Sequence, residues 1–334
     1  MNKSKNHSLS SIIILFFLYI YFPSAFGKIN NIQPVSSLQP QAEKGDASAQ
    51  LELGEKYRLG EEVKQDYTLA AYWYKEAAKQ GLAEAEYKLG VLYANGQGVS
   101  QSYQTAANLY LKAANQGIID AQNNLGILYS KGQGVPKDYT KAILWLKKAA
   151  DSGLTSAQTN LALVYQQTGD VKEAIKWYKI AAEKGERTAQ YYLAYNYYEG
   201  IGIKQDRKQA LKWYEKSAEQ NFYKAQSALG ALYLNGSPVT KMDRHKAIIF
   251  LTDAACQGAP VAQHNLAIVY YYGDKNLPRS YIKAFAWFSV SLKNGLKQSA
   301  ELKDKSAKKL TPLEYIEAQK LAEIYIEKYP YKGN

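Results

Sequence analysis

The chain has few of the residues that most often carry catalysis or cross-links. Its 334 residues include one cysteine, Cys256, and three histidines, His7, His245 and His264. A lone thiol excludes an internal disulfide framework. No group of His, Cys and Asp has the spacing of a metal site, and the sequence shows no nucleophile elbow. We therefore expect a protein that is not an enzyme and that holds no metal and no cofactor.

Long apolar runs are equally scarce. The longest spans residues 12–22, after Lys3 and Lys5 and before Pro23 and the small residues that lead to Gly27. Eleven residues are too few for a bilayer, which needs about twenty. This pattern predicts a cleaved secretory signal over residues 1–27, with an uncleaved anchor or a buried helix as the alternatives. We accordingly expect an exported protein, periplasmic or secreted, with no transmembrane segment after the signal is removed.

Charge is abundant but dispersed. The net charge is +12, and it falls to +10 without residues 1–27, where Lys3 and Lys5 are the charged side chains. Basic residues are spread over every repeat, often beside acids, and form no compact block, so no nucleic-acid partner is expected. Cys256 occupies a slot that elsewhere holds small or polar residues. This predicts a buried or half-buried side chain, with an intermolecular disulfide as the alternative.

What the chain has in quantity is repetition. Seven copies of a phrase of about 36 residues can be aligned on the glycine that opens each copy, with Asn221 in place of the glycine of the sixth. A period of this length predicts a stacked array of supersecondary units. Gly and Asn both tolerate the left-handed conformation, so the spacing marks the end of a second helix in each unit.

Each copy predicts a pair of helices. In the first, a leucine is followed by Gly or Ala and, four residues on, by a tyrosine, as in Leu125, Gly126 and Tyr129. The small residue lets the partner helix approach closely. In the second, Ala142, Trp145 and Ala149 share one face. The tryptophan slot predicts core packing instead of a stacking site for bases or sugars. It holds Trp73, Leu109, Trp145, Trp177, Trp213, Phe250 and Trp287.

The loops between the two helices read Gly-x-Gly-Val-x-x-Asp in several copies. The motif follows no strand, so a hairpin loop is favoured over a phosphate-binding loop. The aspartate stands where an N-cap of the second helix belongs. These aspartates are Asp66, Asp138, Asp206 and Asp243.

This phrase resembles the Sel1-like repeat, a relative of the tetratricopeptide repeat. The resemblance implies an all-α fold, a right-handed superhelical α-solenoid with a concave inner surface. Residues 42–295 hold the seven repeats, and residues 28–41 are a linker or partial N-terminal cap. Residues 296–334 form capping helices and a tail, in which Thr311, Pro312 and Glu314 predict a capping box.

The sequence indicates the function less clearly than it indicates the fold. Alignment to the tetratricopeptide pattern places the inner face at set positions of the first helix, and two copies are rich in aromatics there. The predicted partner-binding residues are Tyr191, Tyr195, Tyr198, Glu199, His264 and Tyr271. Phenols combine apolar area with a hydrogen-bonding tip, although packing between helices would also explain them.

Two functions fit these residues. The first is an exported bacterial scaffold that binds a protein or peptide on the concave face, in host interaction or in envelope complexes. The alternative is a binder of envelope polymers, peptidoglycan or glycan, or a modulator of a cell-wall hydrolase. Polymer binding through dispersed charge should weaken steeply with salt, which separates the two.

Overall fold

The predicted all-α solenoid is confirmed. The computed structural model describes residues 34–273 and 277–331, and all seventeen regular elements in these ranges are helices. The first helices of the seven repeats are α2 (Ala47–Leu59), α4 (Ala83–Asn95), α6 (Ile119–Lys131), α8 (Thr155–Thr168), α10 (Arg187–Glu199), α12 (Tyr223–Asn235) and α14 (Pro260–Tyr272). The second helices are α3 (Tyr67–Lys79), α5 (Tyr103–Asn115), α7 (Tyr139–Asp151), α9 (Val171–Glu183), α11 (Arg207–Glu219), α13 (Arg244–Cys256) and α15 (Tyr281–Lys293). Helix α1 (Val35–Glu43) precedes them, and α16 (Ser299–Ala307) and α17 (Pro312–Lys328) follow.

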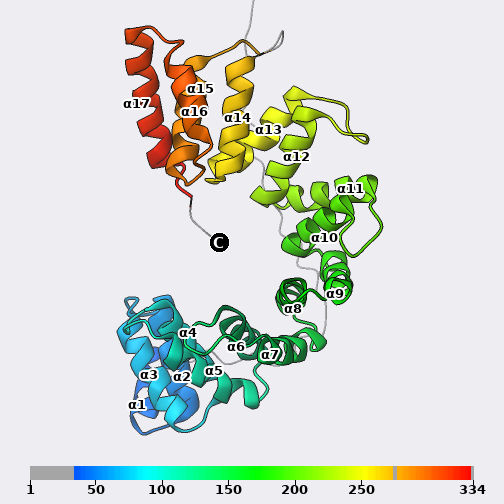
Figure 1. Cartoon of the computed structure of the whole chain (residues 1–334). Helices are drawn as coiled ribbons and strands as arrows, with labels where there is room; N and C mark the ends of the chain where they lie inside the picture. The colour runs from blue at the N-terminus through cyan, green and yellow to red at the C-terminus, as the bar shows by residue number, and fades with distance from the viewer. Residues whose placement is uncertain (1–33, 274–276, 332–334) are drawn as a thin grey trace, which may run out of the picture.

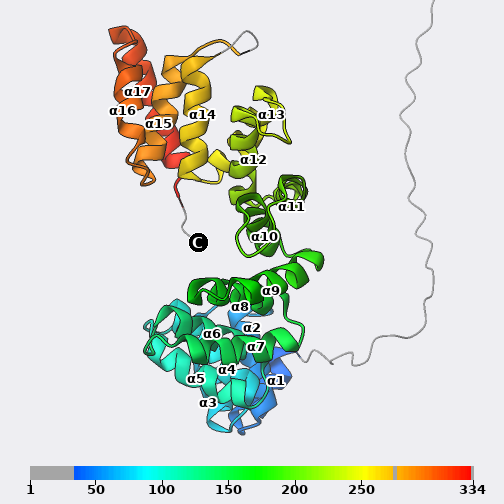
Figure 2. The same ribbon diagram turned by 45° about the vertical axis from the view of Figure 1, so that its right-hand side comes forward.

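The helices form a curved stack. In the first six repeats, the second helix packs on the first helix of its own repeat and on that of the next, whereas α15 packs on α14, α16 and α17. Figures 1 and 2 show the resulting crescent, in which α8 lies on the inner side of α9. First helices of neighbouring repeats also contact each other, α6 with α8 and α12 with α14. In a curved stack the more closely spaced layer is the inner one, so the first helices line the concave surface.

The predicted helix ends are confirmed. Side chains of Asp66, Asp138, Asp206 and Asp243 accept hydrogen bonds from the first-turn amides of their helices. Each bond satisfies an amide that has no partner within the helix. At the other end Asn221 adopts a φ of 57°, the left-handed conformation for which its slot usually holds glycine. No helix in the described ranges is both long and apolar enough to cross a membrane. The predicted signal, residues 1–27, lies outside those ranges.

The tryptophan column is only partly the core. Trp145 and Trp287 are buried, whereas Trp73, Trp177 and Trp213 are half-buried. The more deeply buried slot is the next one along the chain, which holds Tyr74, Tyr110, Leu146, Tyr178, Tyr214, Leu251 and Phe288. This slot faces the small residue of the first helix. A Cβ added at Gly126 would stand 2.6 Å from the Leu146 side chain, which confirms the close approach expected there.

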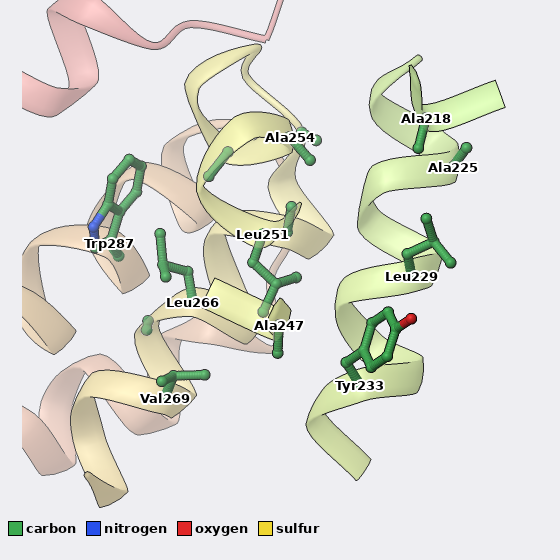
Figure 3. Close-up of a cluster of buried hydrophobic side chains, with 14 of the residues drawn as sticks. Ala218, Ala225, Leu229, Tyr233, Ala247, Leu251, Ala254, Leu266, Val269 and Trp287 are labelled. Atoms are coloured by element: carbon green, nitrogen blue, oxygen red, sulfur yellow. The ribbon is translucent and has the colours of Figure 1, made fainter. Parts of the chain in front are cut away.

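The two ends of the array are covered by extra helices. Leu38 and Ala42 of α1 pack on Leu53 of the first repeat. At the other end, Trp287 lies against Tyr325 of α17, with 4.5 Å between ring centroids. Figure 3 shows Trp287 beside Leu266 in the last, continuous part of the core. The capping box of Thr311 is confirmed. Cys256, by contrast, is exposed at the end of α13, so the expectation of a buried thiol was wrong.

Candidate functional site

Four of the six predicted partner-binding residues surround one groove on the inner surface. Tyr191, Tyr195, Tyr198 and Glu199 line it from α10. Their spacing of four, seven and eight residues puts them on a single helix face. Side chains of α12 form the facing wall, including Ala228, Ala231, Leu232 and Asn235. The groove holds about 310 Å³, the lower end of the range for ligand pockets.

The groove tyrosines differ in their surroundings. The ring of Tyr191 is half-buried and meets Phe222 edge-on, at 5.5 Å between centroids. Burial raises the pKa of Tyr191, and nearby phenols raise it further. The guanidinium of Arg207 lies over the ring of Tyr198, 5.6 Å from its centroid. Tyr195 is 37% exposed. The site therefore combines three different rings. Tyr191 is packed against Phe222, Tyr198 already contacts the cation of Arg207, and Tyr195 is open to solvent.

Tyr214 forms the floor of this groove, and the sequence analysis did not select it. It comes from α11 and is only 4% exposed. Burial raises its pKa well above the usual range, and so do the phenol of Tyr191 and the carboxylate of Glu199. The Tyr214 hydroxyl thus lies near these groups and stays protonated. Its slot directly follows that of Trp213, and because this slot is buried in every repeat, the repeat pattern does not mark it as a groove residue.

The hydroxyl of Tyr214 has no hydrogen-bond partner within residues 34–273 and 277–331. In the same slot of the first and fourth repeats the phenol is bonded. The Tyr74 hydroxyl donates to Glu55 Oε2 at 2.7 Å, and the Tyr178 hydroxyl donates to Gln166 Oε1 at 2.8 Å. Tyr214 lines the groove, and its hydroxyl oxygen is not among the fully enclosed, unpaired polar atoms of the described residues. The hydroxyl is therefore open to water, and a ligand carbonyl in the groove would replace that water as its partner.

The other two predicted residues lie apart from the groove. His264 is only 8% exposed, its Nδ1 is 2.9 Å from Ser299 Oγ, and its ring lies edge-on to Phe288. Burial lowers the pKa of His264 and keeps the ring neutral. A satisfied, buried histidine is not presented to a partner, which corrects its assignment to the accessible inner face. Tyr271 is half-buried against the rings of Tyr272 and Tyr281.

A wider hollow, of about 960 Å³, lies beside the hairpin loop between α12 and α13. Its basic side chains are Lys241, Arg244, His245 and Lys246. The guanidinium of Arg244 is engaged with the Gly273 carbonyl at 2.6 Å, and the ammonium of Lys246 with the ring of Tyr233. Despite its smaller volume, the tyrosine groove is the stronger candidate, because four phenols and an exposed carboxylate line it. Among the described residues no group of three His, Cys, Asp or Glu is placed to hold a metal ion.

Comparison with known proteins agrees with the architecture. The Sel1 repeat family model matches seven consecutive stretches, residues 47–82, 83–118, 119–154, 155–186, 188–222, 224–258 and 260–296. No curated protein matches the chain.

Two solved structures are similar over most of the array. One is c5321, a protective antigen present in uropathogenic Escherichia coli strains, with 32% identity and a TM-score of 0.57 over 88% of this chain and 72% of that one. The other is a Sel1 repeat protein from Oxalobacter formigenes, with 32% identity and a TM-score of 0.62 over 66% of this chain and 89% of that one. By the seven matched stretches and by its fold, the chain belongs to the Sel1 repeat family.

Proposed function

We propose that the chain is a non-catalytic scaffold that binds a protein or peptide segment in the groove between α10 and α12. The observation that carries this proposal is the groove lining itself, in which four phenols meet, those of Tyr191, Tyr195, Tyr198 and Tyr214. Tyrosine is enriched at protein interfaces because it offers a large rigid ring with a polar tip. A groove of about 310 Å³ suits a short extended segment.

A displayed pool of random octapeptides, selected on the immobilised full chain, tests this proposal. Recovered peptides are then measured against Tyr195→Ala and Tyr198→Ala. Tyr72→Ala serves as the matched control, because Tyr72 is 52% exposed and lies on α3, in the outer layer. We expect each groove variant to weaken binding about tenfold or more, the effect of losing about 1.4 kcal/mol of contact. Peptides that bind the groove variants and the control equally well would contradict the proposal.

We further propose that this scaffold acts after export. The support is the sequence of residues 1–27, a basic start followed by a short apolar run and small residues. Expression of the full chain in a Gram-negative host, followed by intact-mass measurement, tests it. Cleavage after Gly27 would give a product that begins at Lys28. Recovery of an uncleaved chain from the cytoplasm would refute it.

A further inference from the structure

We infer that the groove selects a peptide with a cationic side chain, arginine or lysine, which binds between the ring of Tyr195 and the carboxylate of Glu199. This inference rests on the proposed function and adds the chemistry of the ligand. The groove is lined by one charged side chain, Glu199, and otherwise by tyrosine, alanine, leucine, asparagine and glycine residues.

The wider inner surface makes Glu199 stand out. The same first-helix positions in the neighbouring repeats hold no ionised group. In the fourth repeat they are Thr159, Leu163, Gln166 and Gln167, and in the sixth Ser227, Ala231, Leu234 and Asn235. In the seventh they are the neutral, buried His264 with Ile268, Tyr271 and Tyr272. At these positions of the fourth to seventh repeats, Glu199 is therefore the one carboxylate.

That charge is also uncompensated. Glu199 is exposed and forms no ion pair or hydrogen bond with any residue that the structure describes. The inner-face carboxylate of the first repeat, Glu55, is treated differently, because Arg58 and Lys88 both pair with it. The chain thus neutralises one inner carboxylate with its own cations and leaves the other available to a ligand.

Tyr195 supplies the second half of a cation site. It stands four residues before Glu199 on α10, so its ring and the carboxylate are neighbours on one helix face. A guanidinium or ammonium is attracted to the face of a phenol ring. Arg207 already makes this contact with Tyr198. Tyr195 makes no comparable contact with the residues described and is 37% exposed, which leaves its ring for a ligand cation.

A third polar group, the Tyr214 hydroxyl, would hold the peptide backbone. The protonated Tyr214 hydroxyl is a hydrogen-bond donor at the groove floor, and a carbonyl of the bound segment would accept from it. Attraction of a ring and a carboxylate at a partly exposed site gives roughly fivefold to thirtyfold selectivity for a cationic residue over glutamine. The net charge of +12 acts in the opposite direction, since it favours acidic peptides at long range. Enrichment of basic peptides therefore cannot arise from the overall field of the chain.

The octapeptide pool also tests this inference, read by the composition of the recovered peptides at about 0.15 M salt, where exposed charges are screened beyond about 8 Å. The variants are Glu199→Gln and a matched control, Glu219→Gln, which removes the same charge from the exposed end of α11. We expect arginine and lysine to be enriched roughly fivefold or more by the wild-type chain and by Glu219→Gln. Glu199→Gln should abolish that enrichment.

The outcomes separate the two claims. Peptides that depend on Tyr195 but are not enriched in arginine or lysine would overturn this inference and leave the proposed function intact. The same conclusion follows if Glu199→Gln still enriches basic peptides. Failure to recover any peptide that depends on the groove would overturn the proposed function, and this inference with it.

Discussion

The two buried residues Tyr74 and Tyr214 occupy the same slot, and we predict that removing the Tyr74 hydroxyl lowers stability, whereas removing the Tyr214 hydroxyl weakens peptide binding. In Tyr74→Phe the chain loses a hydrogen bond of 2.7 Å to the Glu55 carboxylate. Bonds to charged groups contribute about 1.5–3 kcal/mol. Glu55 keeps Arg58 and Lys88 as partners, so its charge is not left unpaired and the lower value applies. We expect a loss of about 1.5 kcal/mol of unfolding free energy.

In Tyr214→Phe no hydrogen bond within the described residues is lost. The ring stays the same size, so packing against Tyr191 is kept. We expect a change in unfolding free energy of no more than about 0.5 kcal/mol, because the hydroxyl has no hydrogen-bond partner among the described residues. The same substitution should nevertheless weaken binding of groove-selected peptides by about fivefold to tenfold, the net value of one hydrogen bond.

Urea denaturation followed by circular dichroism measures the first effect, and fluorescence anisotropy of a labelled peptide measures the second. Long repeat arrays can lose two-state behaviour. Amide hydrogen exchange in α2 and α3, compared with α10 and α11, therefore shows where each loss falls. If Tyr214→Phe destabilises the chain as much as Tyr74→Phe, the Tyr214 hydroxyl is already paired in the folded protein. The argument for a ligand donor at the groove floor then fails.

Three further predictions concern the scaffold. Gly126→Ala places a Cβ 2.6 Å from Leu146. The cost of overpacking, about 1–3 kcal/mol, should exceed the roughly 1 kcal/mol gained in helix propensity, so the variant should be less stable. A double-mutant cycle with Leu146→Ala should show strong coupling, and additive effects would contradict the close packing. Gln50 donates to the Ala42 carbonyl and accepts from Gln80. Gln158 donates to the Ala150 carbonyl and leaves its Oε1 unpaired. In thermal melts Gln50→Met should therefore cost about 1 kcal/mol more stability than Gln158→Met, and equal losses would contradict this difference in hydrogen bonding. Burial lowers the pKa of His264 below its ordinary value of 6.5, so the unfolded chain binds more protons than the folded chain. The stability contributed by the neutral ring is therefore complete above pH 6.5 and is lost as the pH falls through the folded pKa. Urea titrations from pH 7 to pH 5 should show a shallower decline in stability for His264→Gln, and an unchanged slope would refute this.

Periodicity made the scaffold readable from the sequence. A position that is ambiguous in one copy can be assigned from the other six copies. For this reason the aspartate caps and the left-handed conformation of Asn221 were predicted correctly. The same comparison of copies placed the core at the tryptophan slot, whereas the most deeply buried side chains occupy the next slot. Tryptophan is the most conspicuous residue of its helix, but of the five tryptophans Trp145 and Trp287 alone are buried. The smaller side chain in the next slot fills the space above the first-helix glycine.

The candidate site was readable only in part, because it departs from the pattern instead of repeating it. Spacing along one helix brought Tyr191, Tyr195, Tyr198 and Glu199 together correctly. Tyr214 was missed because its groove exposure depends on which residue stands opposite, and that is set between repeats. His264 was selected by the same spacing, yet α16 packs over it through Ser299. A repeat pattern cannot anticipate a cover supplied by a helix outside the array.

The position of the groove gives it mechanical leverage. The array is held together by contacts between neighbours, so each boundary between repeats acts as a joint between two stiff arms. The groove lies at the joint between the fifth and sixth repeats, near the middle of the crescent in Figure 1. A rotation of a few degrees there displaces the far ends of both arms. A segment wedged between α10 and α12 would therefore set the width of the opening that the whole crescent presents to a larger partner.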